Sequence, residues 1–302
     1  MTRKEVPAVF TGLSAFPLTP LRDDRLDDRA YAGLITRLVT AGVASIGALG
    51  STGSYAYLSR EERARAAALA VQHAGETPVI VGIGALRLRH VLDAADDAQQ
   101  AGAAAVLLAP MSYQPLTPDE IYRLYEQVTA HLSVPLVVYD NPRTTHVSLT
   151  DDLYAAIAKL PHVTSIKVPP LPADPAIARD RVTALRGRLP GHVGIGVSGD
   201  PVAAVALHAG CDAWYSVIGG TLPRLALDIT RAPDAAAARA ASDRLRPLWD
   251  LFAAHGSVRV VAAIAEHLGL TAAGCLPAPL RGLAPDARNA VIHALAEVDP
   301  TA

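Results

Sequence analysis

The sequence predicts an α/β fold: a closed TIM (β/α)₈ barrel followed by a C-terminal helical extension. Eight short apolar runs rich in β-type residues recur along the chain, and stretches with helix-type patterns separate them. The spacing of these runs, roughly 20 to 35 residues, is the length of one strand–helix unit. Beyond Gly220 only helix-type patterns follow. Eight strand–helix units followed by helices alone are what this architecture requires.

The eight apolar runs are nearly continuous, which is typical of parallel strands covered by helices on both faces. They cover residues 9–16, 45–50, 78–84, 105–110, 135–142, 163–170, 192–199 and 213–220. An open doubly wound sheet is the alternative. That fold wants a GxGxxG turn after its first strand, whereas this first run is followed by AFPLTP at 15–20. Eight strand–helix units therefore favour closure into a barrel.

Helices are expected between these strands. Three of them open with a hydroxyl residue and an acidic first turn, which is an N-cap pattern, and Pro118 occupies a first helical position. The expected helices are Asp27–Ala41, Ser59–Ala74, Leu88–Ala101, Thr117–Leu132 and Thr150–Leu160.

The C-terminal part of the chain reads as helix only. Its helical stretches are 234–241, Arg244–His255, Val258–Leu268 and Pro285–Val298. The alanine-rich stretch is read as helix because alanine is the best helix former. Since this is more chain than one strand–helix unit needs, we expect a barrel over 1–222 and a helical extension over 223–302 that packs on it.

Composition favours a small-molecule partner. The net charge of −2 gives no bulk field that would recruit nucleic acid or an anionic membrane. The N-terminal stretch lacks a long apolar segment, no apolar run approaches the ~20 residues of a membrane helix, and the two cysteines form no metal or disulfide framework. We therefore expect a cytoplasmic protein.

A lysine in an apolar strand is the feature around which the chemistry is organised. Lys167 lies in VTSIKVPP at 163–170, near the end of the sixth strand, and Tyr139 lies near the end of the fifth. Strand alternation places Tyr139 with Val137, and Lys167 with Ser165. Because adjacent strands run ~4.8 Å apart, the amine and the phenol are expected to address one substrate atom. In a barrel this edge carries the active site.

An amine and a phenol so placed suit Schiff-base formation with a 2-oxo acid. Burial favours the neutral amine that attacks the ketone, and the phenol can shuttle protons. The turn Gly50-Ser51-Thr52-Gly53 can supply backbone N–H groups and two hydroxyls to the carboxylate. The imine on Lys167 is covalent, so no cofactor is expected.

Each feature alone has an ordinary structural explanation. A strand-end lysine can extend to water, a tyrosine can be a half-buried aromatic, and glycine-rich turns are common strand-to-helix connections. The ten histidines form no HxH or HExxH spacing, so no metal is expected. What favours the functional interpretation is the placement of these features at neighbouring strand ends.

From Phe10 to about Gly282 the chain resembles the dihydrodipicolinate synthase / N-acetylneuraminate lyase family of class I aldolases. The motifs that carry the resemblance cover most of the chain in order. They are AFPLTP (15–20), GSTG (50–53), PVIVGIG (78–84), the tyrosine of VVYDNP (137–142), IK (166–167) and VSGD (197–200).

The resemblance implies a role for individual residues. It implies that Lys167 forms the Schiff base, that Tyr139 relays protons, and that Ser51 and Thr52 hold the pyruvate carboxylate, with the Ser51 hydroxyl also in the relay. It further implies that family members form homotetramers built from dimers. The remaining residues that it places around the substrate are Gly50, Gly53, Gly199, Asp200 and Tyr215.

The chain departs from the family pattern where the second substrate binds. Ser54 replaces the glutamate of GSTGE, and Val168 with two prolines replaces the stretch after IK. Arg143 directly follows Pro142, and Thr144 stands where the synthases place an arginine. The relay tyrosine that the family donates across a dimer interface falls on Ser112, with Tyr113 one step away.

These observations predict a Schiff-base lyase that joins or cleaves a 2-oxo acid and an aldehyde. We rank an aldolase with another aldehyde above 4-hydroxy-tetrahydrodipicolinate synthase proper, and a sugar-acid dehydratase with the same imine is a third option. A catalytically silent sensor that binds 2-oxo acids is the competing class, because the positions Ser54, Val168 and Ser112 are altered. We expect a homodimer or homotetramer without nucleic-acid or membrane partners.

Overall fold

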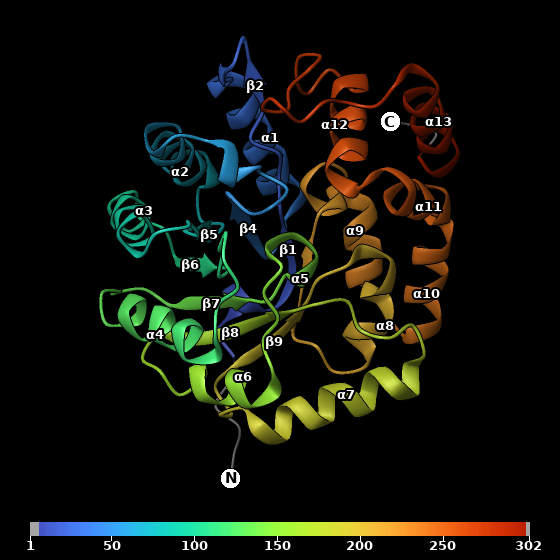
Figure 1. The fold of residues 1–302 in the computed structure, drawn as a ribbon. Coiled ribbons are helices and arrows are strands. Elements are labelled where there is room, and N and C mark those ends of the chain that lie inside the picture. The colour runs from blue at the N-terminus through green and yellow to red at the C-terminus, as the bar shows by residue number, and fades with distance from the viewer. Residues whose placement is uncertain (1–5, 300–302) are drawn as a thin grey trace.

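The fold is seen in a computed structural model that describes residues 6–299. Eight parallel strands close into a barrel in the order β1-β10-β9-β8-β7-β6-β5-β4, and β4 pairs back onto β1 (Figure 1). The predicted barrel is confirmed. The strands are β1 Gly12–Ala15, β4 Ser45–Ala48, β5 Val79–Gly82, β6 Ala105–Leu108, β7 Leu136–Tyr139, β8 Val163–Val168, β9 Gly194–Val197 and β10 Ala213–Ser216.

Helices connect the strands and surround the barrel. The predicted caps of α2 and α4 are full capping boxes, in which Ser59 and Thr117 exchange hydrogen bonds with Glu62 and Glu120. The helices are α1 Asp28–Ala41, α2 Arg60–Ala74, α3 Leu88–Gln100, α4 Pro118–Thr129, α6 Asp151–Ile157, α7 Pro175–Arg188, α8 Ala203–His208 and α9 Pro223–Thr230.

The strands are shorter than the apolar runs that predicted them. The remaining residues of these runs lie in the loops at the strand ends, where short elements form. A small antiparallel hairpin also follows the AFPLTP stretch. These elements are η1 Ala8–Phe10, β2 Leu21–Arg22, β3 Arg25–Leu26, η2 Tyr55–Tyr57, α5 Pro142–Thr145, η3 Asp200–Val202 and η4 Ile218–Gly220.

The buried apolar side chains form two clusters, one outside the ring of strands and one inside it. The larger cluster fills the layer between the strands and the helices. The smaller one contains Phe16, Val137, Tyr139 and Tyr215 and fills the barrel interior. Alternation along β7 therefore places Val137 and Tyr139 inside the barrel and Leu136 and Val138 outside it, as the sequence predicts.

The C-terminal helices lie along one side of the molecule, coloured orange to red in Figure 1. Helix α10 packs against α8 and α9, and α12 packs against both α11 and α13. Buried side chains of this region, such as Leu248 and Val260, belong to the same apolar cluster as the barrel helices. The helices are α10 Ala235–Arg244, α11 Arg246–His255, α12 Ser257–His267 and α13 Pro285–Val298. The boundary at residues 222 and 223 stays a prediction.

Among residues 6–299, no helix combines the length and the apolar character needed to cross a membrane.

Candidate active site

Lys167 extends from β8 into the barrel and is surrounded by aromatic rings. It pairs in register with Tyr139 of the neighbouring strand β7, and its side chain is buried. Its Nζ atom lies 4.0 Å from the ring centroids of both Phe16 and Tyr139, and 5.4 Å from that of Tyr215. The predicted proximity of amine and phenol is therefore present in the structure.

Burial changes the protonation of this lysine. Loss of hydration lowers the pKa of Lys167 from 10.5 to about 7, although the negative charge of Asp200 opposes that change. A large fraction of the amine is consequently neutral near neutral pH. The neutral amine is the form that attacks a carbonyl carbon.

Tyr139 is a buried phenol with polar neighbours. Burial raises the pKa of its hydroxyl to about 12, while the nearby polar side chains of Ser51, Ser198 and Asn141 act in the opposite direction. Asn141 Nδ2 also donates a hydrogen bond of 3.2 Å to Ser51 Oγ. The phenol therefore remains protonated at neutral pH and has hydroxyl groups close by through which a proton can pass.

The GSTG turn after β4 is held in an unusual backbone conformation. Leu49 and Ser54, which flank the turn, have φ angles of 56° and 52°, a region that residues with a Cβ adopt at a cost. Thr52 is buried and Ser51 is partly buried. Such strained turns cluster at ligand-binding sites, which is consistent with the predicted carboxylate site.

The two glycines of this turn make room for neighbouring side chains. A Cβ atom on Gly50 would lie 2.4 Å from the Phe16 ring, and one on Gly53 would lie 2.8 Å from Thr19 Oγ1. The Phe16 ring therefore packs between the GSTG turn and the amine of Lys167.

Asp200 lies under the site and its carboxylate already has partners. It accepts hydrogen bonds from Trp214 Nε1 (3.0 Å) and from the backbone N–H groups of Val217 (3.2 Å) and Ile218 (2.6 Å). These bonds fix the ends of β9 and β10 together. Asp200 therefore affects the site through its charge on Lys167 and through position, and its predicted contact with substrate stays a prediction.

Gly199 explains one of the unusual prolines. Its φ angle is 87°, and a Cβ atom there would lie 2.6 Å from Pro170 Cγ. Pro170 therefore packs directly on the turn that carries Asp200. Of the two prolines that follow Val168, Pro170 thus contacts the turn after the next strand.

Tyr215 extends into the barrel and bonds to the strand that carries Lys167. Its hydroxyl forms a hydrogen bond of 2.8 Å with Ser165 Oγ, one layer below Lys167. Its ring packs edge-to-face on Phe16, with centroids 5.9 Å apart. Tyr215 thus supports the lysine from beneath.

Three predicted residues lie at the surface or the rim within one chain. Tyr113 is 90% exposed in the loop after β6, and Arg143 is exposed on the short helix α5. Ser112 is partly buried in the same loop as Tyr113. A single chain does not bring Tyr113 to Lys167.

Two residues that contact the predicted catalytic side chains were not predicted from the sequence. Phe16 follows β1 and covers Lys167, and Asn141 follows β7 and contacts Ser51. Phe16 comes directly after a strand, in AFPLTP, and Asn141 comes two residues after one, in VVYDNP. This position near a strand end could have indicated a role for both. Among the described residues, no group of three or more histidine, cysteine or acidic side chains could hold a metal ion.

The fold and the site define a class of protein: a barrel with a buried Schiff-base lysine at a strand end. The sequence profile described as the Dihydrodipicolinate synthetase family matches residues 9–298. The chain therefore belongs to this family, and it is a lyase of the class I aldolase type.

Individual relatives agree with this assignment. The solved structure of a dihydrodipicolinate synthase from Agrobacterium tumefaciens is similar with a TM-score of 0.91 and 42% identity, over 96% of this chain and 99% of that one. A 4-hydroxy-tetrahydrodipicolinate synthase from Phenylobacterium zucineum is 29% identical over 273 residues, which is 88% of this chain and 90% of the relative. A solved monomeric dihydrodipicolinate synthase variant, 24% identical with a TM-score of 0.86 over 96% of this chain and 97% of that one, shares the fold.

Proposed function

We propose that this protein joins pyruvate, or another 2-oxo acid, to an aldehyde or cleaves such a product through an imine on Lys167. The observation that carries the proposal is the buried amine of Lys167, 4.0 Å from the Tyr139 ring and with its pKa lowered to about 7 by burial. Burying an amine costs free energy, so a buried lysine with a perturbed pKa is a candidate for a functional role. No cofactor is needed, because the lysine itself activates the substrate.

Lys167 and Tyr139 together can carry out the first chemical steps. The neutral amine of Lys167 attacks C2 of the oxo acid, and a proton moves from nitrogen to oxygen to give a carbinolamine. Taking up one more proton, the oxygen leaves as water and a protonated imine remains. Loss of a proton from C3 then gives the enamine and returns that proton. Tyr139 is suited to carry it, because its hydroxyl lies among Ser51, Ser198 and Asn141.

The carboxylate of the oxo acid is assigned to the GSTG turn. Ser51 and Thr52 offer hydroxyl groups, and consecutive backbone N–H groups of such a turn form a concave anion site. The left-handed conformations of Leu49 and Ser54 support this assignment, because strain of this kind clusters at ligand sites. Hydrogen-bond donors in fixed positions would orient C2 toward Lys167.

The acceptor is proposed to be an aldehyde other than aspartate semialdehyde. Arg143, the arginine nearest to the synthase position in sequence, is exposed on α5. Val168 and the prolines, one of which packs on Gly199, change the stretch after the lysine. These changes favour an aldolase with a different acceptor over 4-hydroxy-tetrahydrodipicolinate synthase proper.

Borohydride trapping tests the imine. The protein is incubated with pyruvate and sodium borohydride, and its intact mass is measured. We expect one pyruvate adduct in the wild type and in Lys159→Ala, whose lysine is exposed, and no adduct in Lys167→Ala. The adduct should form faster at pH 8 than at pH 6. An adduct that survives in Lys167→Ala contradicts the proposal.

A panel of aldehydes then separates the candidate functions. Aspartate semialdehyde, sugar aldehydes and aromatic aldehydes are offered with pyruvate, and aldehyde consumption is followed. Fastest turnover of aspartate semialdehyde would assign synthase activity. A rise in melting temperature with pyruvate, with no aldehyde consumed, would identify a sensor instead.

We infer further that the protein is a homo-oligomer. Three large apolar side chains are exposed on consecutive strand–helix loops: Tyr57 (49% exposed), Leu86 (60%) and Tyr113 (90%). These loops follow β4, β5 and β6, which are neighbours in the barrel. Large apolar side chains exposed on neighbouring loops favour a protein interface, and a second copy of the chain is the partner we propose.

A further inference from the structure

Three neighbouring strands carry residues at the same level of the barrel. Tyr139 of β7 pairs with Lys167 of β8, and Lys167 pairs with Gly196 of β9. Gly196 faces the interior, because a Cβ atom on it would lie 2.1 Å from the ring of Tyr215. The strand beside Lys167 therefore has no side chain at this level, and alternation makes Ser198 the next residue that faces inward.

Ser198 extends the sheet by one residue beyond β9. Its N–H donates a hydrogen bond of 2.9 Å to the carbonyl oxygen of Val168, so the pairing between β8 and β9 continues to this position. Two residues along a strand cover about 7 Å, and side chains lean along the strand direction. The long side chain of Tyr139 and the short one of Ser198 therefore approach each other on the mouth side of the Lys167 level.

The Ser198 hydroxyl is buried, and among the described residues its Oγ atom has no hydrogen-bond partner. The side chain nevertheless lies near enough to the Tyr139 hydroxyl to lower the pKa of that phenol. Buried polar side-chain atoms usually have a partner, and a serine hydroxyl can accept one hydrogen bond while it donates another. The proton of Ser198 is thus left for an acceptor that the free protein does not supply.

The turn that carries Ser198 is fixed from two sides. On one side Pro170 packs on Gly199, where a Cβ atom would lie 2.6 Å from Pro170 Cγ. On the other side the Asp200 carboxylate accepts hydrogen bonds from two backbone N–H groups directly after β10. Groups that transfer protons need such fixed positions. The proline after Lys167 that distinguishes this chain therefore supports the turn that holds the serine.

We propose that the Ser198 hydroxyl carries a proton from Tyr139 to the oxygen atom on C2 when the carbinolamine on Lys167 loses water. This inference rests on the proposed function. Ser198 gives its own proton to the C2 oxygen and takes the proton of the Tyr139 hydroxyl in the same step. The bond between C2 and oxygen breaks, the nitrogen lone pair forms the C=N bond, and water leaves. The remaining Tyr139 phenolate removes the proton from C3, which gives the enamine and restores the phenol.

Pyruvate labelled with ¹⁸O at C2 tests this step, because the ketone oxygen leaves as water each time the imine forms. The rate of label loss is followed by mass spectrometry and corrected for the rate with Lys167→Ala. We expect Ser198→Ala to slow the catalysed loss on the order of 10- to 100-fold, since a water molecule is a poorer relay than a fixed hydroxyl. After long incubation with borohydride the same variant should still reach one pyruvate adduct.

Two further variants separate the hydroxyl from the rest of the side chain and from buried hydroxyls in general. Ser198→Thr keeps a hydroxyl and should lose label at a rate within a few-fold of the wild type. Thr271→Val removes a buried hydroxyl between α12 and α13, away from the strand ends, and should change neither the label loss nor the adduct.

Each outcome decides between the inference and the function on which it rests. Label loss in Ser198→Ala within twofold of the wild type overturns the inference and leaves the proposed function standing. Equal slowing in Ser198→Ala and Ser198→Thr overturns it too, because the shape of the side chain and not its hydroxyl would then matter. A Ser198→Ala protein that never forms the adduct assigns the residue to binding or folding, which also overturns the inference. A wild type that forms no adduct and loses label no faster than Lys167→Ala fails the proposed function itself.

Discussion

Lys167 is held by three aromatic rings and by the backbone of β8, and this environment has a thermodynamic cost. Its pKa is about 7 in the folded protein and 10.5 in an unfolded chain, because burial removes water from the ammonium group. Between these two values the unfolded chain binds more protons than the folded one. Stability therefore rises with pH across this window, and at pH 7 to 8 the lysine destabilises the fold.

Replacing the amine by an apolar group of similar length should remove this cost. We expect Lys167→Met to raise the free energy of unfolding by on the order of 1 to 3 kcal/mol at pH 7 to 8, and the gain should shrink toward pH 10. Urea denaturation at several pH values measures it. Lys159→Met, at an exposed position, serves as the control and should change stability little. A Lys167→Met protein less stable than wild type at pH 7 would contradict this account of the lysine.

The sequence predicted Lys167 and Tyr139 but not the side chains that complete their surroundings. Strand parity and neighbouring strand ends are enough to place an amine beside a phenol. Phe16 and Asn141 lie in loops, where no periodicity tells which way a side chain points. The sequence placed Asp200 at the site but did not show that Trp214 and two backbone N–H groups donate hydrogen bonds to its carboxylate. Such pairing depends on tertiary contacts that a strand pattern does not contain.

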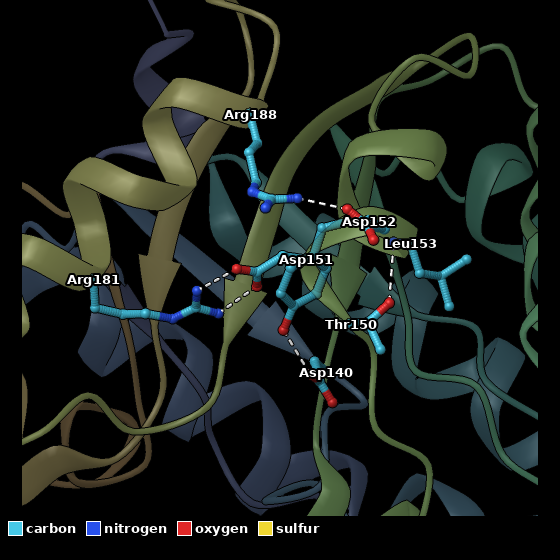
Figure 2. Close-up of polar contacts among 8 residues, drawn as sticks. Asp140, Thr150, Asp151, Asp152, Leu153, Arg181 and Arg188 are labelled. Carbon is cyan, nitrogen blue, oxygen red and sulfur yellow. Dashed lines mark hydrogen bonds and ion pairs between the residues drawn. The ribbon is translucent and has the colours of Figure 1, made fainter.

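At the scale of elements, α6 connects the active-site strand β7 to the outer helices. Tyr154 of α6 donates a hydrogen bond of 2.5 Å to Asp140, the residue after Tyr139, and the Asp140 N–H donates to the Lys167 carbonyl oxygen at 3.0 Å. On the outer face of α6, Asp151 and Asp152 pair with arginines of α7 (Figure 2). The ends of β7 and β8 are thus fixed from the helical layer.

Breaking the bond between Tyr154 and Asp140 should loosen this arrangement. The other Asp140 oxygen has no hydrogen-bond partner, so Tyr154→Phe leaves a buried carboxylate with only the Leu149 N–H at 3.3 Å. We expect a loss of about 1 to 3 kcal/mol in the free energy of unfolding. Tyr122→Phe, at a half-buried tyrosine of α4, is the control. If urea denaturation gives Tyr154→Phe the same free energy of unfolding as the wild type and as Tyr122→Phe, the bond to Asp140 contributes nothing to stability.

The helices between strands were predicted unevenly. Those with hydroxyl caps and acidic first turns, such as α2 and α4, begin within a residue of their predicted starts. The hairpin of β2 and β3 and the short helix α5 were not predicted, because two to four residues carry no measurable periodicity. Long helices and strands with a buried apolar face can be predicted from the sequence. Short elements whose conformation depends on the surrounding loop cannot.

At the scale of the whole molecule, one apolar cluster joins the barrel helices and the C-terminal helices. Closure of the eight strands removes the edges of the barrel sheet, so we look for an association surface among the exposed apolar side chains. Tyr57, Leu86 and Tyr113 supply it at the carboxyl ends of the strands, next to the candidate active site. An oligomer formed there would place a partner's side chains close to the second-substrate half of the site.

A charge introduced into this patch should separate the subunits. We expect the wild type to have the mass of a dimer or a tetramer in light scattering coupled to size exclusion, and Leu86→Arg to shift it toward smaller species, because a buried guanidinium without a partner is costly. Ile177→Arg is the matched control: Ile177 is 56% exposed on α7, a helix that packs between α6 and α8 and follows a different part of the barrel. A monomeric wild type, or dissociation by Ile177→Arg alone, would rule out this face as the interface. Aldehyde turnover that falls with dissociation, while the pyruvate adduct persists, would show that the partner completes the acceptor half of the site.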